Sequence, residues 1–174
     1  SKIMRRIYKM KRMKRFLGLL LCGILALGCL VSCGEDKVIE AVNENIEAFV
    51  ERVVEGYIEE GDMTAADVLE KIYKDSTIKY KDIEIDDNIA TVTVEVKSKN
   101  FNSIILRATD VAISNIDLLT PVETLMNNAM WEVYDKEEPE EREVEITLTK
   151  LDDTWIIDPE SVSNVTYLIT GIRY

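Results

Sequence analysis

The stretch that decides the fold is residues 86–96, DDNIATVTVEV. After its acidic start, every second residue from Ala90 to Val96 is apolar, which is the period of a strand with one buried face. Residues 78–85 are rich in Ile and also read as a strand, so the acidic segment is expected to join two strands in a β-hairpin. Alternation fails near Asp82, which predicts a β-bulge there.

A second hairpin is predicted further along the chain. Residues 144–148 alternate in the same way and, after an acidic turn at residues 152–153, the chain resumes with the apolar pattern of residues 155–157. Residues 135–142, rich in Glu, are expected to form a solvated connection before this hairpin. The pattern of residues 165–169 fits either a last strand or a short closing helix.

Helical periodicity precedes the first hairpin. Apolar residues between 39 and 57 recur at the spacing of one helix face, and Gly61 is expected to end this long helix. Thr64 with Asp67 predicts the N-cap of a shorter helix that runs towards residue 73. The two helices are expected to form a hairpin.

Helical periodicity returns between the two β-hairpins. Residues 102–119 carry a predicted apolar stripe that includes Ile116 and Leu119. The segment 120–123 then predicts another helix start, with Thr120 as the cap, Pro at the first helical position and Glu at the third. The chain is therefore expected to adopt an α+β fold, in which helices pack against one face of a curved antiparallel sheet.

The first 32 residues have a different character. Eight basic residues and no acidic ones lie in residues 1–15, and residues 16–31 are almost entirely apolar. A basic start followed by an apolar run of this length predicts an export signal, helical while it is in the membrane. The segment Leu30-Val31-Ser32-Cys33, followed by Gly, resembles a bacterial lipobox.

The lipobox resemblance implies that Cys33 is lipidated and that the chain is cut just before it. Residues 1–32 are then the signal peptide, residues 33–36 the lipidated anchor with a short tether, and residues 37–174 a single α+β domain. Because two acyl chains give stable attachment, the expected location is the extracytoplasmic face of the cell membrane, with the membrane as a partner through Cys33.

Several kinds of chemistry are excluded by composition. The chain has no His, and its other cysteines, Cys22 and Cys29, lie in the expected signal peptide. With Cys33 acylated, the mature chain has no thiol, so disulfides, thiolate metal sites and Ser-His-Asp triads are excluded. The Asp-rich turns lack the ligand spacing of a calcium loop, and neither a metal site nor a cofactor is expected.

Charge argues against two classes of partner. Residues 33–174 contain 33 acidic and 13 basic side chains, a formal charge of −20. A surface of this sign repels phosphate backbones and anionic lipid headgroups. Nucleic acid is therefore not expected as a partner, and the domain is expected to stand off the lipid surface.

The mature segment resembles the nuclear-transport-factor-two-like, or cystatin-like, superfamily of cone-shaped α+β folds, which includes small secreted lipoproteins. The resemblance rests on the long first helix, on residues 87–94 and on the late hairpin 144–157, and it covers most of residues 36–171. It implies a pocket between the curved sheet and the helices. In some members of the superfamily that pocket is catalytic, and in others it binds ligands.

Five residues are candidates for lining such a pocket. An isomerase or dehydratase would need a carboxylate with a raised pKa and a Tyr hydroxyl, for which Asp110, Tyr80 and Tyr134 are candidates. Trp131 and Trp155 are candidate lining residues, although a Trp beside an apolar stripe is commonly part of the core.

The leading hypothesis is a non-enzymatic ligand-binding or protein-interaction module tethered to the membrane. A pocket enzyme that uses a carboxylate and a Tyr is one alternative, and a structural accessory subunit of an envelope complex is another. A closed apolar pocket is expected if the module binds small molecules, whereas a filled interior favours a protein partner.

Overall fold

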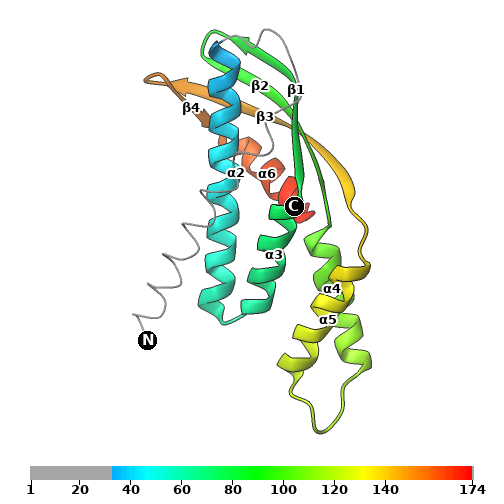
Figure 1. Ribbon diagram of the computed structural model, residues 1–174. Coiled ribbons are helices and arrows are strands. Elements are labelled where there is room, and N and C mark those ends of the chain that lie inside the picture. The colour runs from blue at the N-terminus through cyan, green and yellow to red at the C-terminus, as the bar shows by residue number, and fades with distance from the viewer. Residues whose placement is uncertain (1–32, 174) are drawn as a thin grey trace. The chain divides into compact units, whose positions relative to one another are not determined.

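The computed structural model describes residues 33–173 (Figure 1). Its helices are α2 (Cys33–Glu60), α3 (Met63–Asp75), α4 (Phe101–Ser114), α5 (Val122–Lys136) and α6 (Val162–Thr170). Its strands are β1 (Thr77–Asp86), β2 (Ile89–Ser98), β3 (Glu140–Leu151) and β4 (Thr154–Ile157), and a short 3₁₀ turn covers Pro159–Ser161. The predicted α+β class is confirmed. The expected signal peptide, with Leu30, Val31 and Ser32, lies outside the described residues.

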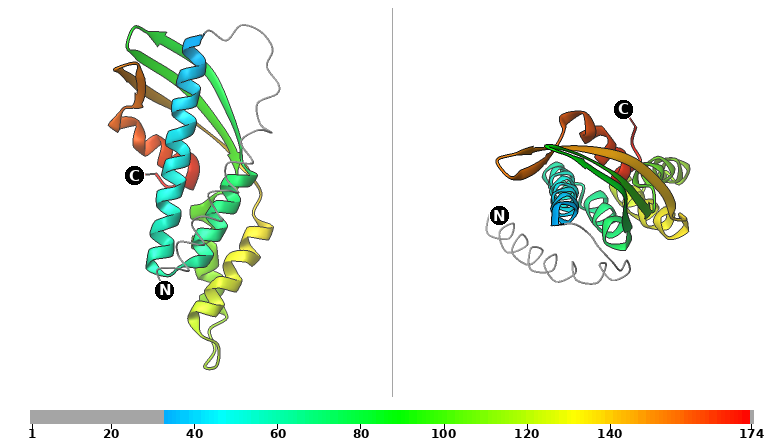
Figure 2. Two further views of the ribbon diagram at one scale, coloured as in Figure 1. Left: turned by 60° about the vertical axis from the view of Figure 1, so that its left-hand side comes forward. Right: turned by 90° about the horizontal axis from the view of Figure 1, so that it is seen from above.

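The four strands form one antiparallel sheet in the order β1-β2-β3-β4, with both predicted hairpins present. The predicted bulge is also confirmed, since the β1–β2 register shifts between Lys81 and Glu84 and Asp82 has a φ of 48°. Asp adopts this left-handed backbone conformation more readily than a β-branched residue does. The sheet is curved (Figure 2).

One face of the sheet is buried. Ala90, Val92, Val94 and Val96 of β2 are at most 1% exposed, which the alternating sequence predicts. Helix α2 packs on this face and contributes a stripe of buried residues at a spacing of four, namely Val38, Val42, Ile46 and Val50 (Figure 1). The opposite face carries the polar residues of the strands, among them Glu95, which bridges to Lys79 and Lys81.

Two expectations about α2 and α3 are corrected. Residues 33–36, expected to form a tether, are the first residues of α2. The N-cap of α3 is Asp62 rather than Thr64, and its carboxylate accepts a hydrogen bond from the Ala65 backbone N–H at 2.9 Å. Gly61, with a φ of 90°, ends α2 so close to this point that Thr64 already lies within the first turn of α3.

The expected solvated connection at residues 135–142 is also corrected. Helix α5 continues to Lys136 and β3 starts at Glu140, and Arg142 is only 3% exposed. The Arg142 guanidinium donates to the Leu168 carbonyl at 3.1 Å and to the Ser98 hydroxyl at 2.6 Å, and it pairs with Glu140 at 2.6 Å. These acceptors compensate the loss of hydration, so the charge can be buried.

The closing segment is the helix α6 and not a strand. Its Val165, Leu168 and Ile169 are buried, and Gly171 ends it in a left-handed conformation. The helix lies along the edge of β3 that β4 leaves free, where the Ser161 hydroxyl accepts a hydrogen bond from the Thr147 N–H at 3.0 Å. An exposed strand edge is thereby covered.

Candidate interaction site

The structure distributes the five predicted pocket residues over four elements. Asp110 is exposed on α4, Tyr80 lies on β1, and Trp155 is 7% exposed on β4 as part of the core. Trp131 and Tyr134 of α5 are in contact, with ring centroids 5.6 Å apart in an edge-to-face arrangement. The five side chains therefore do not converge on one cavity.

Both tyrosine hydroxyls are engaged in links between elements. Tyr80 donates to the side chain of Asn43 on α2, and Tyr134 donates to Asp75 of α3 at 2.9 Å. Burial raises the pKa of both phenols, and Asp75 raises that of Tyr134 further. Both groups therefore remain protonated at neutral pH and hold helices and strands together.

Large side chains fill the space between the helices and the sheet. Phe101, Ile104, Met130 and Leu168 are each at most 1% exposed, and Phe101 packs edge-to-face on Tyr57 with ring centroids 5.7 Å apart. Two open grooves lie elsewhere in the described part of the chain. One, of about 330 Å³, lies between α6 and β3, and the other, of about 350 Å³, lies between α4 and α5.

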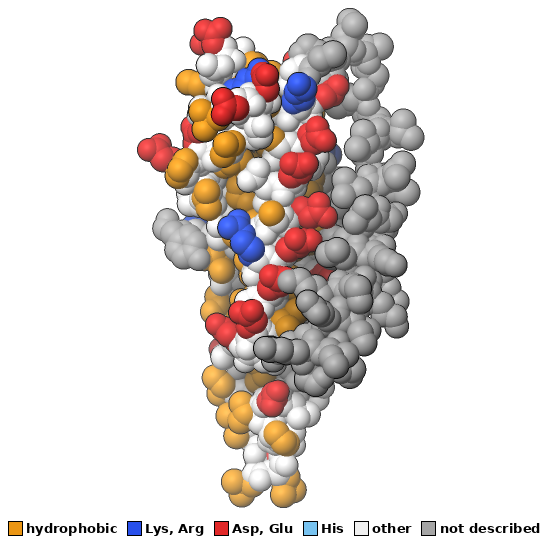
Figure 3. Space-filling view, turned by 90° about the vertical axis from the view of Figure 1, so that its left-hand side faces the viewer, with side chains coloured by type: hydrophobic (Ala, Val, Ile, Leu, Met, Phe, Trp, Pro, Cys, Tyr) orange, Lys and Arg blue, Asp and Glu red, His pale blue; other side chains and the backbone are white. Residues whose placement is uncertain are grey.

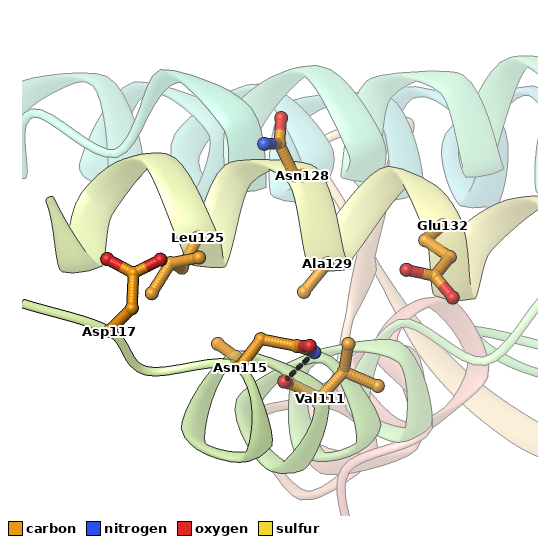
Figure 4. A pocket seen from close by; sticks show the side chains of 8 residues that line it. Val111, Asn115, Asp117, Leu125, Asn128, Ala129 and Glu132 are labelled. Atoms are coloured by element: carbon orange, nitrogen blue, oxygen red, sulfur yellow. Dashed lines mark hydrogen bonds between the residues drawn. The ribbon is translucent and has the colours of Figure 1, made fainter. Parts of the chain in front are cut away.

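The α4–α5 groove is a mixed polar and apolar surface (Figure 4). Val111, Leu125 and Ala129 supply its apolar part, with Asn115 and Asp117 towards the loop that joins the two helices. The Asn115 side-chain amide donates to the Val111 carbonyl at 2.7 Å, which satisfies one of the last carbonyls of α4. The groove is thus a shallow extension of the hairpin surface.

Exposed apolar side chains are concentrated where α4 and α5 join. We call Ile113, Ile116, Leu118, Leu119 and Val122 the apolar tip; their exposures are 60%, 59%, 104%, 93% and 66%. Figure 3 shows hydrophobic side chains gathered at the lower end of that view. Single exposed apolar residues are ordinary, whereas five of them within residues 113–122 are a candidate interaction surface.

Two sequence expectations fail at the apolar tip. Ile116 and Leu119 were expected on a buried stripe, but α4 ends at Ser114 and both residues lie beyond it. Thr120 was expected to cap α5, but Pro121 occupies the N-cap position without a side-chain bond. Thr120 therefore lies one residue before the N-cap, where its hydroxyl donates a hydrogen bond to Asp117 at 2.9 Å.

Asp117 organises the turn of the tip. Its Oδ1 accepts hydrogen bonds from the backbone N–H groups of Leu119 at 2.7 Å and Thr120 at 2.6 Å. These two donors and the Thr120 hydroxyl lower the pKa of the Asp117 carboxyl, so it is ionised at neutral pH. An Asp that bonds the backbone two residues on is a recognised turn signal, and it was the available sequence clue to this site.

The described residues give two further findings on site chemistry and topology. Within 33–173, His, Cys, Asp and Glu side chains form no group of three or more that is placed to hold a metal ion. Of the helices that the structure describes, none combines the length and apolar character needed to cross a membrane.

Comparisons with known proteins give one structural likeness. The chain matches no protein-family model. A search of curated proteins also returned no match. The chain is similar to the crystal structure of a "putative lipoprotein (ycdA)" from Bacillus subtilis, with 23% identity and a TM-score of 0.46, over 74% of this chain. The similar region spans 46% of the Bacillus chain, somewhat less than half its length.

Proposed function

We propose that this protein is a membrane-anchored extracytoplasmic lipoprotein that acts as a non-enzymatic protein-interaction module. The basic segment, apolar run and Leu30–Cys33 motif support the anchor. Helix α2 begins at Cys33, so an acyl group there would attach directly to a helix that packs on the sheet. The anchor would then constrain how the domain is held at the membrane.

The observation that carries the interaction role is the apolar tip. Leu118 and Leu119 are almost completely exposed, and they contribute no burial to the core. The space between helices and sheet, where the superfamily resemblance implies a pocket, is occupied by side chains such as Phe101 and Met130. Binding at an outer surface therefore explains more of this structure than binding inside the fold.

The placement of the predicted catalytic residues does not favour the pocket enzyme. Asp110 faces solvent, and the Tyr80 and Tyr134 hydroxyls bond to Asn43 and Asp75. An accessory subunit of an envelope complex is a particular form of the proposed role, since it also works through surface contacts.

Metabolic labelling with a palmitate analogue tests the anchor. The full chain produced in a bacterial host should incorporate the label, and Cys33→Ala should not. Cys29→Ala is the matched control, because it removes a cysteine four residues earlier and should leave labelling intact. Label retained by Cys33→Ala, or lost in Cys29→Ala, would contradict the assignment of Cys33.

Formaldehyde treatment of intact cells that carry the tagged full chain tests the interaction role. We expect a discrete adduct in which a second protein is linked to the chain. Recovery of the chain as an unlinked monomer, under conditions that link a known envelope complex in the same cells, would refute the module role. A small molecule retained by the purified chain in native mass spectrometry would favour ligand binding in its place.

A further inference from the structure

The apolar tip is held in a defined conformation before any partner binds. Asp117 fixes the backbone N–H groups of Leu119 and Thr120, and this turn displays the Leu118 and Leu119 side chains to solvent. Ordering a loop on binding opposes association, so a preformed turn improves affinity. These hydrogen bonds favour one conformation of the turn, as is expected of a docking element.

The tip lies at the end of the domain away from the first residue of α2 (Figures 1 and 2). Helix α2 has 28 residues, which at 1.5 Å per residue is about 42 Å. The α4–α5 hairpin extends past the C-terminal end of α2 in both side views. With the anchor at Cys33, the tip points away from the anchoring membrane, so a partner beyond the headgroup region suits it better than lipid.

The charge around the tip selects the kind of partner. Residues 108–124, which include the tip, contain three acidic side chains, Asp110, Asp117 and Glu123, and no Lys or Arg. The nearest cation before them, Arg107, is paired with Glu137 at 2.9 Å. A second copy of this acidic surface would be repelled, and so would anionic lipid, whereas a basic surface would be attracted.

We infer that the apolar tip docks into an apolar groove of an envelope protein, and that Lys or Arg side chains frame this groove. Leu118 and Leu119 enter the groove, and Asp117, Glu123 and Asp110 face its basic rim. The inference rests on the proposed function and adds the contact residues and the chemistry of the partner. It also accounts for the acidic residues, with no Lys or Arg, in residues 108–124.

Site-specific photocrosslinking in intact cells tests the inference. The full chain carries benzoylphenylalanine in place of Leu118, or, as a matched control, in place of Ile156, which is 46% exposed on β4. We expect ultraviolet light to link position 118 to one protein and position 156 to none. The linked protein is then purified and serves as the binding probe.

The purified probe should bind the full chain in detergent. Leu118→Ser and Leu119→Ser should each raise Kd by about 10- to 100-fold, because each removes a large apolar group that is buried in the interface. Raising the salt concentration should also weaken binding, since complementary charges are screened. Asp117→Ala should weaken it through the freed turn and the lost charge, and Asp117→Asn, which loses the charge but keeps an oxygen acceptor for the turn, should weaken it less than Asp117→Ala.

The outcomes separate this inference from the proposed function. Crosslinks at position 156 but not at 118 would overturn the tip assignment and leave the module role standing. The same conclusion would follow if the probe bound the parent chain and both serine variants with the same Kd. An adduct made of two copies of this chain, or of lipid, would also overturn it. No adduct at either position, together with no formaldehyde adduct, would remove the proposed function as well.

Discussion

Replacing Gly171 by Ala should destabilise the domain, because it would disturb both the C-terminal end of α6 and the N-terminal end of α4. Gly171 has a φ of 77°, and an added Cβ would lie 2.6 Å from the Cγ and Nδ2 atoms of Asn100. The strain of a left-handed Ala costs about 1 kcal/mol. Asn100 is the N-cap of α4 and accepts from the Ser103 N–H at 3.0 Å, and losing this cap costs about 1 kcal/mol more. The expected total is about 2 kcal/mol.

Urea unfolding followed by Trp fluorescence measures this loss, and two other glycines serve as controls. Gly61 has a φ of 90° with nothing within 4 Å of an added Cβ, so Gly61→Ala should show the strain alone, about 1 kcal/mol. Gly56 lies within α2 with open space around it, and Gly56→Ala should stabilise by about 0.5–1 kcal/mol. A Gly171→Ala loss no larger than that of Gly61→Ala would refute the coupling to Asn100.

Three further predictions follow from the same structure. Arg142→Met should lower the free energy of unfolding by about 2–4 kcal/mol, because the Leu168 carbonyl and Ser98 hydroxyl lose a buried donor; Lys136→Met, at an exposed pair with Glu132, should change it by less than about 1 kcal/mol, and equal losses would contradict the burial argument. Burial, with Glu47 and Glu51 nearby, raises the pKa of Tyr73 to about 12, so the folded state holds this proton longer than the unfolded state, and stability should fall as pH rises from about 10 towards 12; Tyr73→Phe should flatten that part of the unfolding profile, and an unchanged slope would count against it. Leu118→Ser should leave the free energy of unfolding within about 0.5 kcal/mol of that of the parent, whereas Ile104→Ala should lower it by about 2–5 kcal/mol. A large loss for Leu118→Ser would show that the tip stabilises the fold.

The sheet was predictable because its determinants are local. Alternation from Ala90 to Val96 places one face in the core, and the acidic turns allow the left-handed backbone of Asp87, Asp152 and Asp153. The bulge at Asp82 was visible as a break in the same alternation. Long-range packing was not needed to find any of these features.

Features that depend on distant partners were not predictable. The burial of Arg142 requires acceptors on Ser98 and Leu168, which lie 44 and 26 residues away in the sequence. The predictions of helix caps at Thr64 and Thr120 were wrong for a related reason. Both residues have suitable side chains, but the neighbouring carboxylates of Asp62 and Asp117 determine where the turns form. A cap depends on the backbone around the residue as well as on its side chain.

The apolar tip shows why helical spacing alone predicted burial for residues that are exposed. Ala108 and Ala112 of α4 are buried, and the next positions of the same stripe, Ile116 and Leu119, fall beyond the end of the helix. Spacing identifies residues that share a face, but a face is buried only where a second surface reaches it. Past Ser114 no element among residues 33–173 covers Ile116 or Leu119, and Asp117 closes the turn through backbone bonds that do not require an apolar neighbour. The side chains of Leu118 and Leu119 are therefore not needed to make the turn, and the proposed partner would account for their exposure.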